Sequence, residues 1–125
     1  MRRQIASVSQ VNEAVKGLMK ETDQKIHLSE ETSYYLRLVL NELIINSFQH
    51  SGADAAVRVE VGINDTALVI SVEDSGRGIA NRAALGICAD TASETGRGLA
   101  IVKGLCTSLE LNDRDNRVTA RLPLH

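Results

Sequence analysis

Aromatic side chains are nearly absent from this sequence of 125 residues, which holds two tyrosines, one phenylalanine and no tryptophan. Proteins that bind single-stranded nucleic acid stack the bases on aromatic side chains, so this scarcity argues against such a partner. The formal net charge of −2 gives no electrostatic reason to expect nucleic acid or an anionic membrane either. We therefore expect an aliphatic core, with neither nucleic acid nor a membrane as partner.

Cysteines and long apolar runs are also lacking. The two cysteines, Cys88 and Cys106, do not have the spacing of a metal site, which favours free thiols in a reducing compartment. No apolar run approaches the ~20 residues of a membrane-spanning helix. Arg2 and Arg3 are not followed by the apolar stretch of a signal peptide. These absences predict a cytoplasmic protein.

The composition that remains is that of one globular domain. Hydrophobic residues make up 43% of the chain and charged residues 24%, as in ordinary soluble proteins. A chain of this length can build one good core but not two, so we expect a single domain over residues 1–125. No repeat, low-complexity tract or linker divides the sequence.

Hydrophobic periodicity predicts both helices and strands along the chain. The spacing of apolar residues indicates helices at 10–20, 29–50 and 99–106, with a weaker helical stretch at 80–89. Alternation of apolar and polar residues indicates strands at 4–8, 55–63, 67–74, 108–112 and 117–124. The polar segment 22–27 is predicted to be a loop, and turns are expected at 64–65 and 113–116. This order predicts an α/β fold, a two-layer sandwich with helices on one face of a mixed, mostly antiparallel sheet.

Glu42 and Asn46 lie one turn apart on the second predicted helix, at the edge of its apolar face. An asparagine side-chain oxygen can complete the coordination of Mg²⁺ beside phosphates and water. A carboxylate one turn away can orient or deprotonate a water or hydroxyl aimed at a γ-phosphate. A solvated Glu and a locally bonded Asn would explain the same pattern, so this pair alone is weak evidence.

Two glycines follow the strand that ends at Asp74. Gly76 and Gly78 let the backbone bend sharply against a ligand. A carboxylate at the end of the strand can accept a hydrogen bond from an exocyclic amine such as that of adenine. The alternative is a plain strand-ending turn, which the sequence Asp-Ser-Gly makes readily.

A third segment, Thr95-Gly96-Arg97-Gly98-Leu99, places a glycine pair where the third predicted helix begins. The exposed N–H groups at a helix start form an anion site when no side chains obstruct them. The alternative is a glycine hinge before a packed helix. The segment is neither a P-loop nor a dinucleotide fingerprint, because it lacks Gly-Lys-Ser/Thr and a strand directly before it.

In this order and spacing the three segments resemble the N box and the first and second glycine boxes of the GHKL ATPases, the superfamily of gyrase, histidine kinases and MutL. The resemblance covers about residue 4 to the C-terminus and implies the Bergerat fold, with ATP and Mg²⁺ as cofactors. It implies that Glu42 is the general base or water-orienting residue, that Asn46 ligates Mg²⁺ and that Asp74 reads the adenine amino group. The other implied nucleotide-binding residues are Gly76, Gly78, Gly96, Arg97, Gly98 and Leu99. A short ATP lid would lie between residues 79 and 95.

Within the superfamily the sequence is most similar to the stand-alone anti-sigma factor kinases. Histidine kinase catalytic domains usually carry a basic residue where this chain has Gln49, and a phenylalanine in the lid, where this chain has none. The resemblance implies a serine/threonine kinase that phosphorylates an anti-anti-sigma partner, holds a sigma factor and forms a homodimer.

Two alternatives stay open at this stage. One is a nucleotide-gated partner-binding module with little turnover, and the other is a histidine kinase catalytic domain. The sequence also departs from the family pattern, because Asn116-Arg117 stands where a third glycine box often has Gly-Thr. The departure makes fast phosphoryl transfer a weaker expectation than nucleotide binding.

Overall fold

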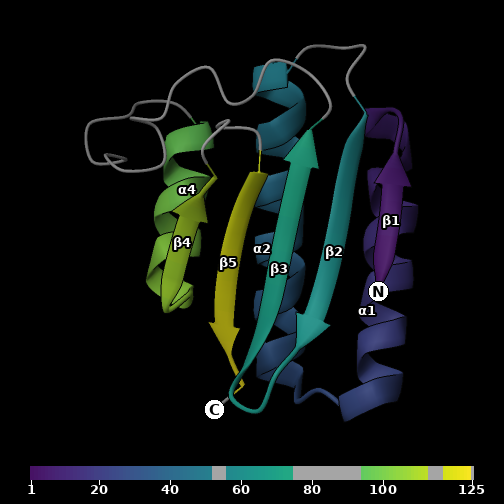
Figure 1. The fold of residues 1–125 in the computed structure, drawn as a ribbon, viewed down its shortest axis with the longest axis vertical. Coiled ribbons are helices and arrows are strands. Elements are labelled where there is room, and N and C mark those ends of the chain that lie inside the picture. Colours follow the sequence, from purple (N-terminus) through teal and green to yellow (C-terminus); the bar gives the residue numbers. More distant parts are fainter. Residues whose placement is uncertain (52–55, 75–93, 113–116, 125) are drawn as a thin grey trace.

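A computed structural model describes residues 1–51, 56–74, 94–112 and 117–124 (Figure 1). The described strands are β1 (Arg2–Ile5), β2 (Val57–Ile63), β3 (Ala67–Asp74), β4 (Ser108–Leu111) and β5 (Arg117–Pro123). The described helices are a short 3-10 helix η1 (Val8–Gln10), α1 (Val11–Ile26), α2 (Glu30–Ser51) and α4 (Glu94–Leu105). None of these helices combines the length and the apolar character needed to cross a membrane.

The five strands form one open sheet in the order β1-β2-β3-β5-β4, and each pairing in the described part is antiparallel. The helices lie against one face of the sheet and leave the other face open (Figure 1). The predicted two-layer α/β sandwich is therefore confirmed, although the described sheet is antiparallel throughout rather than mixed. Strand β5 takes the inner position beside β3, where its alternate residues Val118, Ala120 and Leu122 are buried, and the half-buried β4 forms the edge.

The core lies between the sheet and the helices and is aliphatic, as the scarcity of aromatic residues predicts. Phe48 is the one aromatic residue among the buried core residues of the described part. Full burial of a leucine, isoleucine or valine contributes about 1.5–3 kcal/mol. The largest contributions come from the inner sides of α2 and β3, through Leu36, Val39, Leu40, Leu43, Ile44, Leu68, Ile70 and Val72.

Helix α1 runs through residues 22–26, so the loop predicted for 22–27 is wrong. Thr22 is fully buried, and its hydroxyl donates a hydrogen bond of 2.7 Å to the carbonyl oxygen of Leu18. One turn further on, Ile26 packs against the core. Thr22 and Ile26 therefore extend the core-facing side of the helix by one turn, whereas the residues between them are polar. The helix ends at Ile26, because the φ of 51° at the next residue, His27, cannot continue it.

Two other boundaries differ from the sequence prediction. Strand β1 begins at Arg2 rather than at residue 4 and ends at Ile5. Helix α4 begins at Glu94, five residues before the predicted start at Leu99. The predicted helical stretch at 80–89 and the turn at 113–116 lie outside the described residues.

Candidate functional site

Helix α2 positions the polar pair that the sequence singles out. Its start is capped by Ser29, whose hydroxyl accepts the backbone N–H of Thr32 at 3.1 Å. Glu30 and Glu31 in the first turn interact favourably with the helix dipole. The helix then runs to Ser51, close to the predicted end, and packs against β3 and α4. The pair therefore belongs to a rigid, well-anchored element.

Asn46 lies at the flank of the buried side of α2 and is only 3% exposed. Its side-chain Oδ1 is buried and accepts no hydrogen bond from the part of the chain that the structure describes. A buried acceptor left without a donor costs about 1–3 kcal/mol, so such an atom requires an explanation. A hard cation fits it, because Mg²⁺ takes oxygen ligands and is held by one or two protein groups together with phosphates and water.

Within the described residues, no group of three or more His, Cys, Asp and Glu side chains gathers as a metal site. A cation at Asn46 could complete its coordination with a bound phosphate and with water. This arrangement suits Mg²⁺, which keeps several waters and is seldom enclosed by protein ligands alone.

Glu42 lies one turn before Asn46 on the same side of α2, and it is half-buried. The neighbouring Leu43 and Ile44 are buried, whereas Ile45 faces solvent. Glu42 and Asn46 therefore occupy the border between the buried and the exposed sides of the helix. A carboxylate at this border keeps access to a ligand that approaches from solvent.

Asp74 is the last residue of β3 and is 1% exposed. Strand alternation places its side chain on the helix-covered face, the same face as that of Val72. The end of β3 lies at the same end of the domain as the last turns of α2 and the first turns of α4 (Figure 1). The fold thus brings Asp74 and the Asn46 end of α2 to one end of the helical layer.

The second glycine segment lies inside a helix. Because α4 starts at Glu94, Gly96, Arg97, Gly98 and Leu99 belong to its first two turns instead of preceding it. The backbone N–H groups of the first turn still have no partner within a helix and can bind an anion. Helix α4 contacts α2, and its start lies at the end of the domain where α2 and β3 end (Figure 1).

Part of the predicted site lies outside the described residues. Gly76 and Gly78 belong to this part, as does the lid segment 79–93. The described part of the candidate site consists of the α2 pair, the carboxylate at the end of β3 and the first turns of α4.

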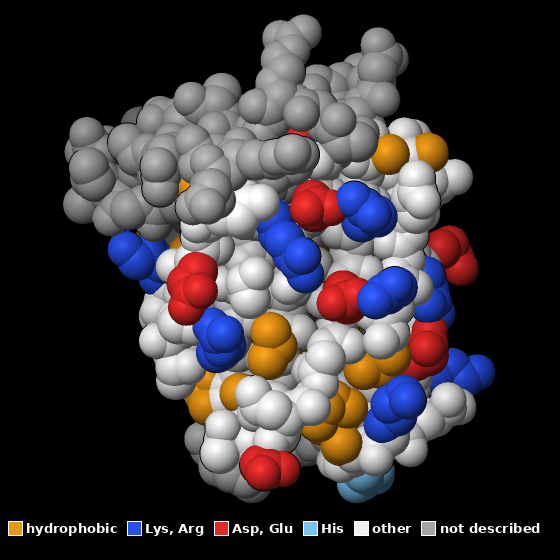
Figure 2. All heavy atoms as spheres, in the orientation of Figure 1, with side chains coloured by type: hydrophobic (Ala, Val, Ile, Leu, Met, Phe, Trp, Pro, Cys, Tyr) orange, Lys and Arg blue, Asp and Glu red, His pale blue; other side chains and the backbone are white. Residues whose placement is uncertain are grey.

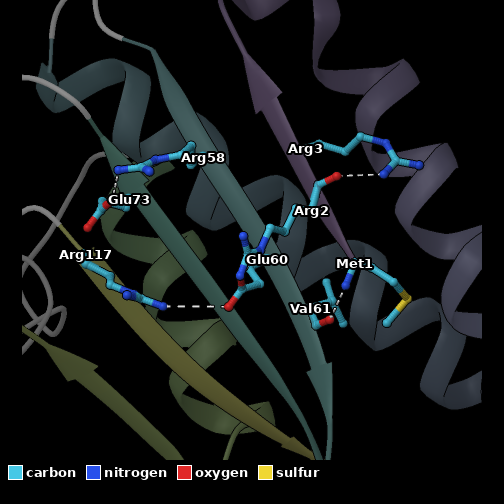
Figure 3. A network of polar contacts seen from close by, with 8 residues as sticks. All are labelled: Met1, Arg2, Arg3, Arg58, Glu60, Val61, Glu73 and Arg117. Atoms are coloured by element: carbon cyan, nitrogen blue, oxygen red, sulfur yellow. Dashed lines mark hydrogen bonds and ion pairs between the residues drawn. The ribbon is translucent and has the colours of Figure 1, made fainter.

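Sequence reasoning did not single out a charged surface on the open face of the sheet, which Figure 2 shows as neighbouring basic and acidic side chains. There Arg58 pairs with Glu73 on the next strand, and Arg2 pairs with Glu60 (Figure 3). A groove of about 400 Å³ lies among them. The alternation of residues 57–63 could have indicated this surface, because the polar residues of that strand point away from the core.

Comparison with known proteins gives a family and a fold. The model of the histidine kinase-like ATPase domain family matches residues 5–122. No curated protein matches the chain. The chain is similar to the histidine kinase domain of a blue-light activated histidine kinase from Erythrobacter litoralis EL346, with a TM-score of 0.60 and 18% identity, over 91% of this chain and 65% of that one.

A second solved structure has a similar fold. It is the catalytic domain of the histidine kinase ThkA, with a TM-score of 0.57 and 16% identity, and the match covers 99% of this chain and 97% of that one. At such identities the likeness shows the fold alone. The chain spans about two thirds of the Erythrobacter domain and nearly all of the ThkA domain.

Proposed function

This chain belongs to the histidine kinase-like ATPase family, within the GHKL superfamily, and from that membership we propose that it is a protein kinase resembling the anti-sigma factor kinases. It transfers the γ-phosphate of Mg-ATP to a serine or threonine of an anti-anti-sigma-like partner protein, and it also binds a sigma factor. The proposal includes a cytoplasmic location and a homodimer.

One observation carries the nucleotide part of this proposal, namely the buried Oδ1 of Asn46 without a hydrogen-bond donor in the described part of the chain. We assign this oxygen to Mg²⁺. When bound, the ion would supply positive charge that offsets the charge of the phosphates. Asn46 would hold this ion through its Oδ1, which α2 keeps in a fixed position.

The other residues have separate tasks in this proposal. Asp74, buried at the end of β3, accepts a hydrogen bond from the adenine amino group. Glu42 orients the substrate hydroxyl and takes its proton, for which its half-buried place on α2 is suitable. Both roles come from the family resemblance.

The glycine segments and their neighbours complete the proposed nucleotide site. Gly96 offers a backbone N–H group of the first turn of α4 to the phosphates. Gly98 and Leu99 lie one turn further on, where their N–H groups bond within the helix, and they line the approach to this turn. Arg97 supplies positive charge for the transferred phosphoryl group. Gly76 and Gly78 shape the adenine pocket beyond the end of β3, and this last assignment rests on the sequence motif.

A hydroxyl acceptor is supported by sequence features and by the order of elements. A short strand, a first long helix and the N-box helix follow one another in this chain, an order that anti-sigma factor kinases share. Gln49, exposed on α2, stands where histidine kinases usually carry a basic residue.

The second candidate function is the catalytic domain of a histidine kinase, the kind of protein from which the two solved structures of similar fold come. A nucleotide-gated partner-binding module with little turnover is the third.

A phosphotransfer assay separates these functions. The protein is incubated with radiolabelled ATP, Mg²⁺ and either a serine-bearing candidate partner or a helical hairpin that carries a histidine. An acid-stable phosphoprotein supports the proposal, whereas an acid-labile one indicates a histidine kinase. ATP-dependent partner binding without a phosphorylated product indicates the module.

Substitutions on α2 test the role of Glu42 in the same assay. Glu42→Gln should lower the transfer rate by about 10²–10⁴-fold, the usual effect of losing a general base, while ATP affinity persists. Glu31→Gln removes the same charge from an exposed position of the same helix and should leave the transfer rate unchanged. Equal rates in both variants would contradict the catalytic assignment.

A further inference from the structure

The open face of the sheet carries a groove that the proposed kinase site does not use. It has a volume of about 400 Å³ and crosses strands β1, β2, β3 and β5 on the side away from the helices. The residues that line it include Arg2, Arg58, Glu60, Ser71, Glu73 and Arg117.

Two of the arginines, Arg2 and Arg58, extend further into solvent than the carboxylates that they contact. The side chain of Arg58 is 68% exposed and that of its partner Glu73 is 24% exposed. Arg2 is 83% exposed, against 41% for its partner Glu60. Arg117 is 43% exposed, close to the 41% of its partner Glu60. The three guanidinium groups therefore all reach solvent, and Glu73 forms the floor of the groove between them.

Each of these ion pairs occupies only part of a guanidinium group. Arg58 contacts Glu73 through one terminal nitrogen, and Arg117 contacts Glu60 through one terminal nitrogen at 3.9 Å (Figure 3). A guanidinium has five N–H donors in a planar fork that matches a carboxylate. The outward donors of the exposed arginines can therefore bind a second anion.

We propose that this groove binds an acidic, extended segment of a partner protein. In the sheet register Arg58 and Arg117 lie on either side of Glu73, two strands and so about 9.5 Å apart. Carboxylates two residues apart in an extended peptide are about 7 Å apart and point the same way. The long arginine side chains span the difference, so one such segment can reach both.

A protein segment fits the groove better than a nucleic acid does. The chain as a whole has a net charge of −2, which opposes a polyanion that extends beyond the groove. The lining residues include no aromatic ring on which a base could stack. The inference does not rest on the proposed kinase activity, because the groove and Asp74 lie on opposite faces of the sheet.

Fluorescence anisotropy of a labelled peptide tests the inference. The probe is a fluorescein-labelled octapeptide of alternating glutamate and serine, and the protein is the full chain. Wild type should bind it with an affinity that falls as salt is added. Arg58→Gln and Arg117→Gln should each weaken binding about fivefold, as the loss of one exposed charge contact predicts.

Two further variants make the result specific. Arg37→Gln removes the same charge from an exposed position on α2 and should change the affinity less than twofold. Glu73→Gln removes a carboxylate from the floor and should tighten binding, which a damaged fold cannot do. Circular dichroism of each variant should match that of wild type.

Several results would overturn the inference. They are unchanged binding in the Arg58→Gln/Arg117→Gln double variant, an equal loss in Arg37→Gln, or tighter binding of an oligothymidylate of equal charge. A wild-type dimer in sedimentation that this double variant dissociates would assign the face to a second copy of the chain. ATP binding, measured in parallel by calorimetry, keeps this outcome separate from that of the proposed kinase function.

Discussion

Replacement of Asn46 by leucine should have opposite effects on the empty protein and on its complex with nucleotide. The Oδ1 of Asn46 is buried and accepts no hydrogen bond in the described part of the chain. Asn46→Leu keeps a side chain of similar size and removes this acceptor. If the oxygen is there to hold Mg²⁺, the empty protein gains stability from the change and the nucleotide complex loses it.

The size of the first effect follows from the burial of Asn46. A buried acceptor without a donor costs about 1–3 kcal/mol, and the loss of the Nδ2 group offsets part of the gain. We expect the free energy of unfolding of the empty protein to rise by about 1 kcal/mol. For a domain of this length that corresponds to a Tm increase of about 4 °C.

The second effect follows from ligand linkage. A ligand at a hundred times its Kd stabilises the native state by about 2.7 kcal/mol. Wild type in Mg-ATP at that concentration should therefore melt several degrees higher than without it. The Asn46→Leu variant should show almost none of this shift, since its nucleotide lacks the protein ligand of the metal.

Thermal melts by circular dichroism, with and without Mg-ATP, measure both effects. Asn41→Leu is the matched control, because Asn41 is half-buried on the same helix and its Nδ2 donates to the carbonyl oxygen of Arg37 at 3.0 Å. This control should keep the full nucleotide shift. A destabilised empty Asn46→Leu protein that still gains the wild-type shift from Mg-ATP would refute the reasoning.

Three further predictions concern the ends of β3, α2 and α4. Asp74→Asn should weaken ATP binding, measured by calorimetry, by about tenfold or more, because a hydrogen bond to a charged acceptor contributes that much. An unchanged affinity would show that Asp74 does not recognise the adenine. Ser29→Ala should lower the free energy of unfolding in urea by about 1 kcal/mol through loss of the α2 cap, and an unchanged midpoint would argue against the cap. Burial raises the pKa of the Cys106 thiol to about 11 from an ordinary 9.0, so at pH 8 a Cys88→Ser protein should react with iodoacetamide about a hundredfold more slowly when folded than in urea. The unfolded chain loses the thiol proton at a lower pH than the folded protein does, so this thiol lowers the free energy of unfolding as the pH rises from about 9 to 11. Equal labelling rates of the folded and the unfolded protein would contradict the raised pKa and this pH dependence.

Strong periodicity allowed most elements to be predicted from the sequence. Strand β2 alternates buried and more exposed residues along its length, and the predicted range 55–63 contains it. The turn after it is also as expected, since Asn64 Oδ1 accepts the backbone N–H groups of Thr66 and Ala67 at 2.9 and 2.8 Å. In these segments the local pattern and the tertiary packing favour the same structure.

The sequence was less informative where packing outweighs local composition. Residues 22–26 are mostly polar, yet Thr22 is buried and Ile26 packs against the core, so the last turn of α1 stays in contact with the core. The start of α4 was placed too late because Gly96 and Gly98 are poor helix formers, and a helix nonetheless includes them. The order of strands was not predictable either, since the pairing of β5 with β3 joins residues about 50 apart in the sequence.

The candidate site could be predicted as residue types but not as an arrangement. Glu42 and Asn46 are recognisable because helical spacing puts them on one side. That Asp74 and the first turns of α4 lie at the same end of the domain depends on the direction of β3 and α4 in the fold (Figure 1). No single-sequence pattern contains that direction, which is why the family resemblance was needed to connect the three segments.

Strand β3 separates the two sites proposed for this domain. Its last two residues, Glu73 and Asp74, have side chains on opposite faces because neighbouring residues of a strand alternate. Glu73 lies in the charged groove beside Arg58, whereas Asp74 is buried beneath the helices. A side-chain change at Glu73 therefore alters the open face without entering the nucleotide site, and a change at Asp74 does the reverse. If either substitution affects both peptide and ATP binding, the two faces are coupled through the end of β3.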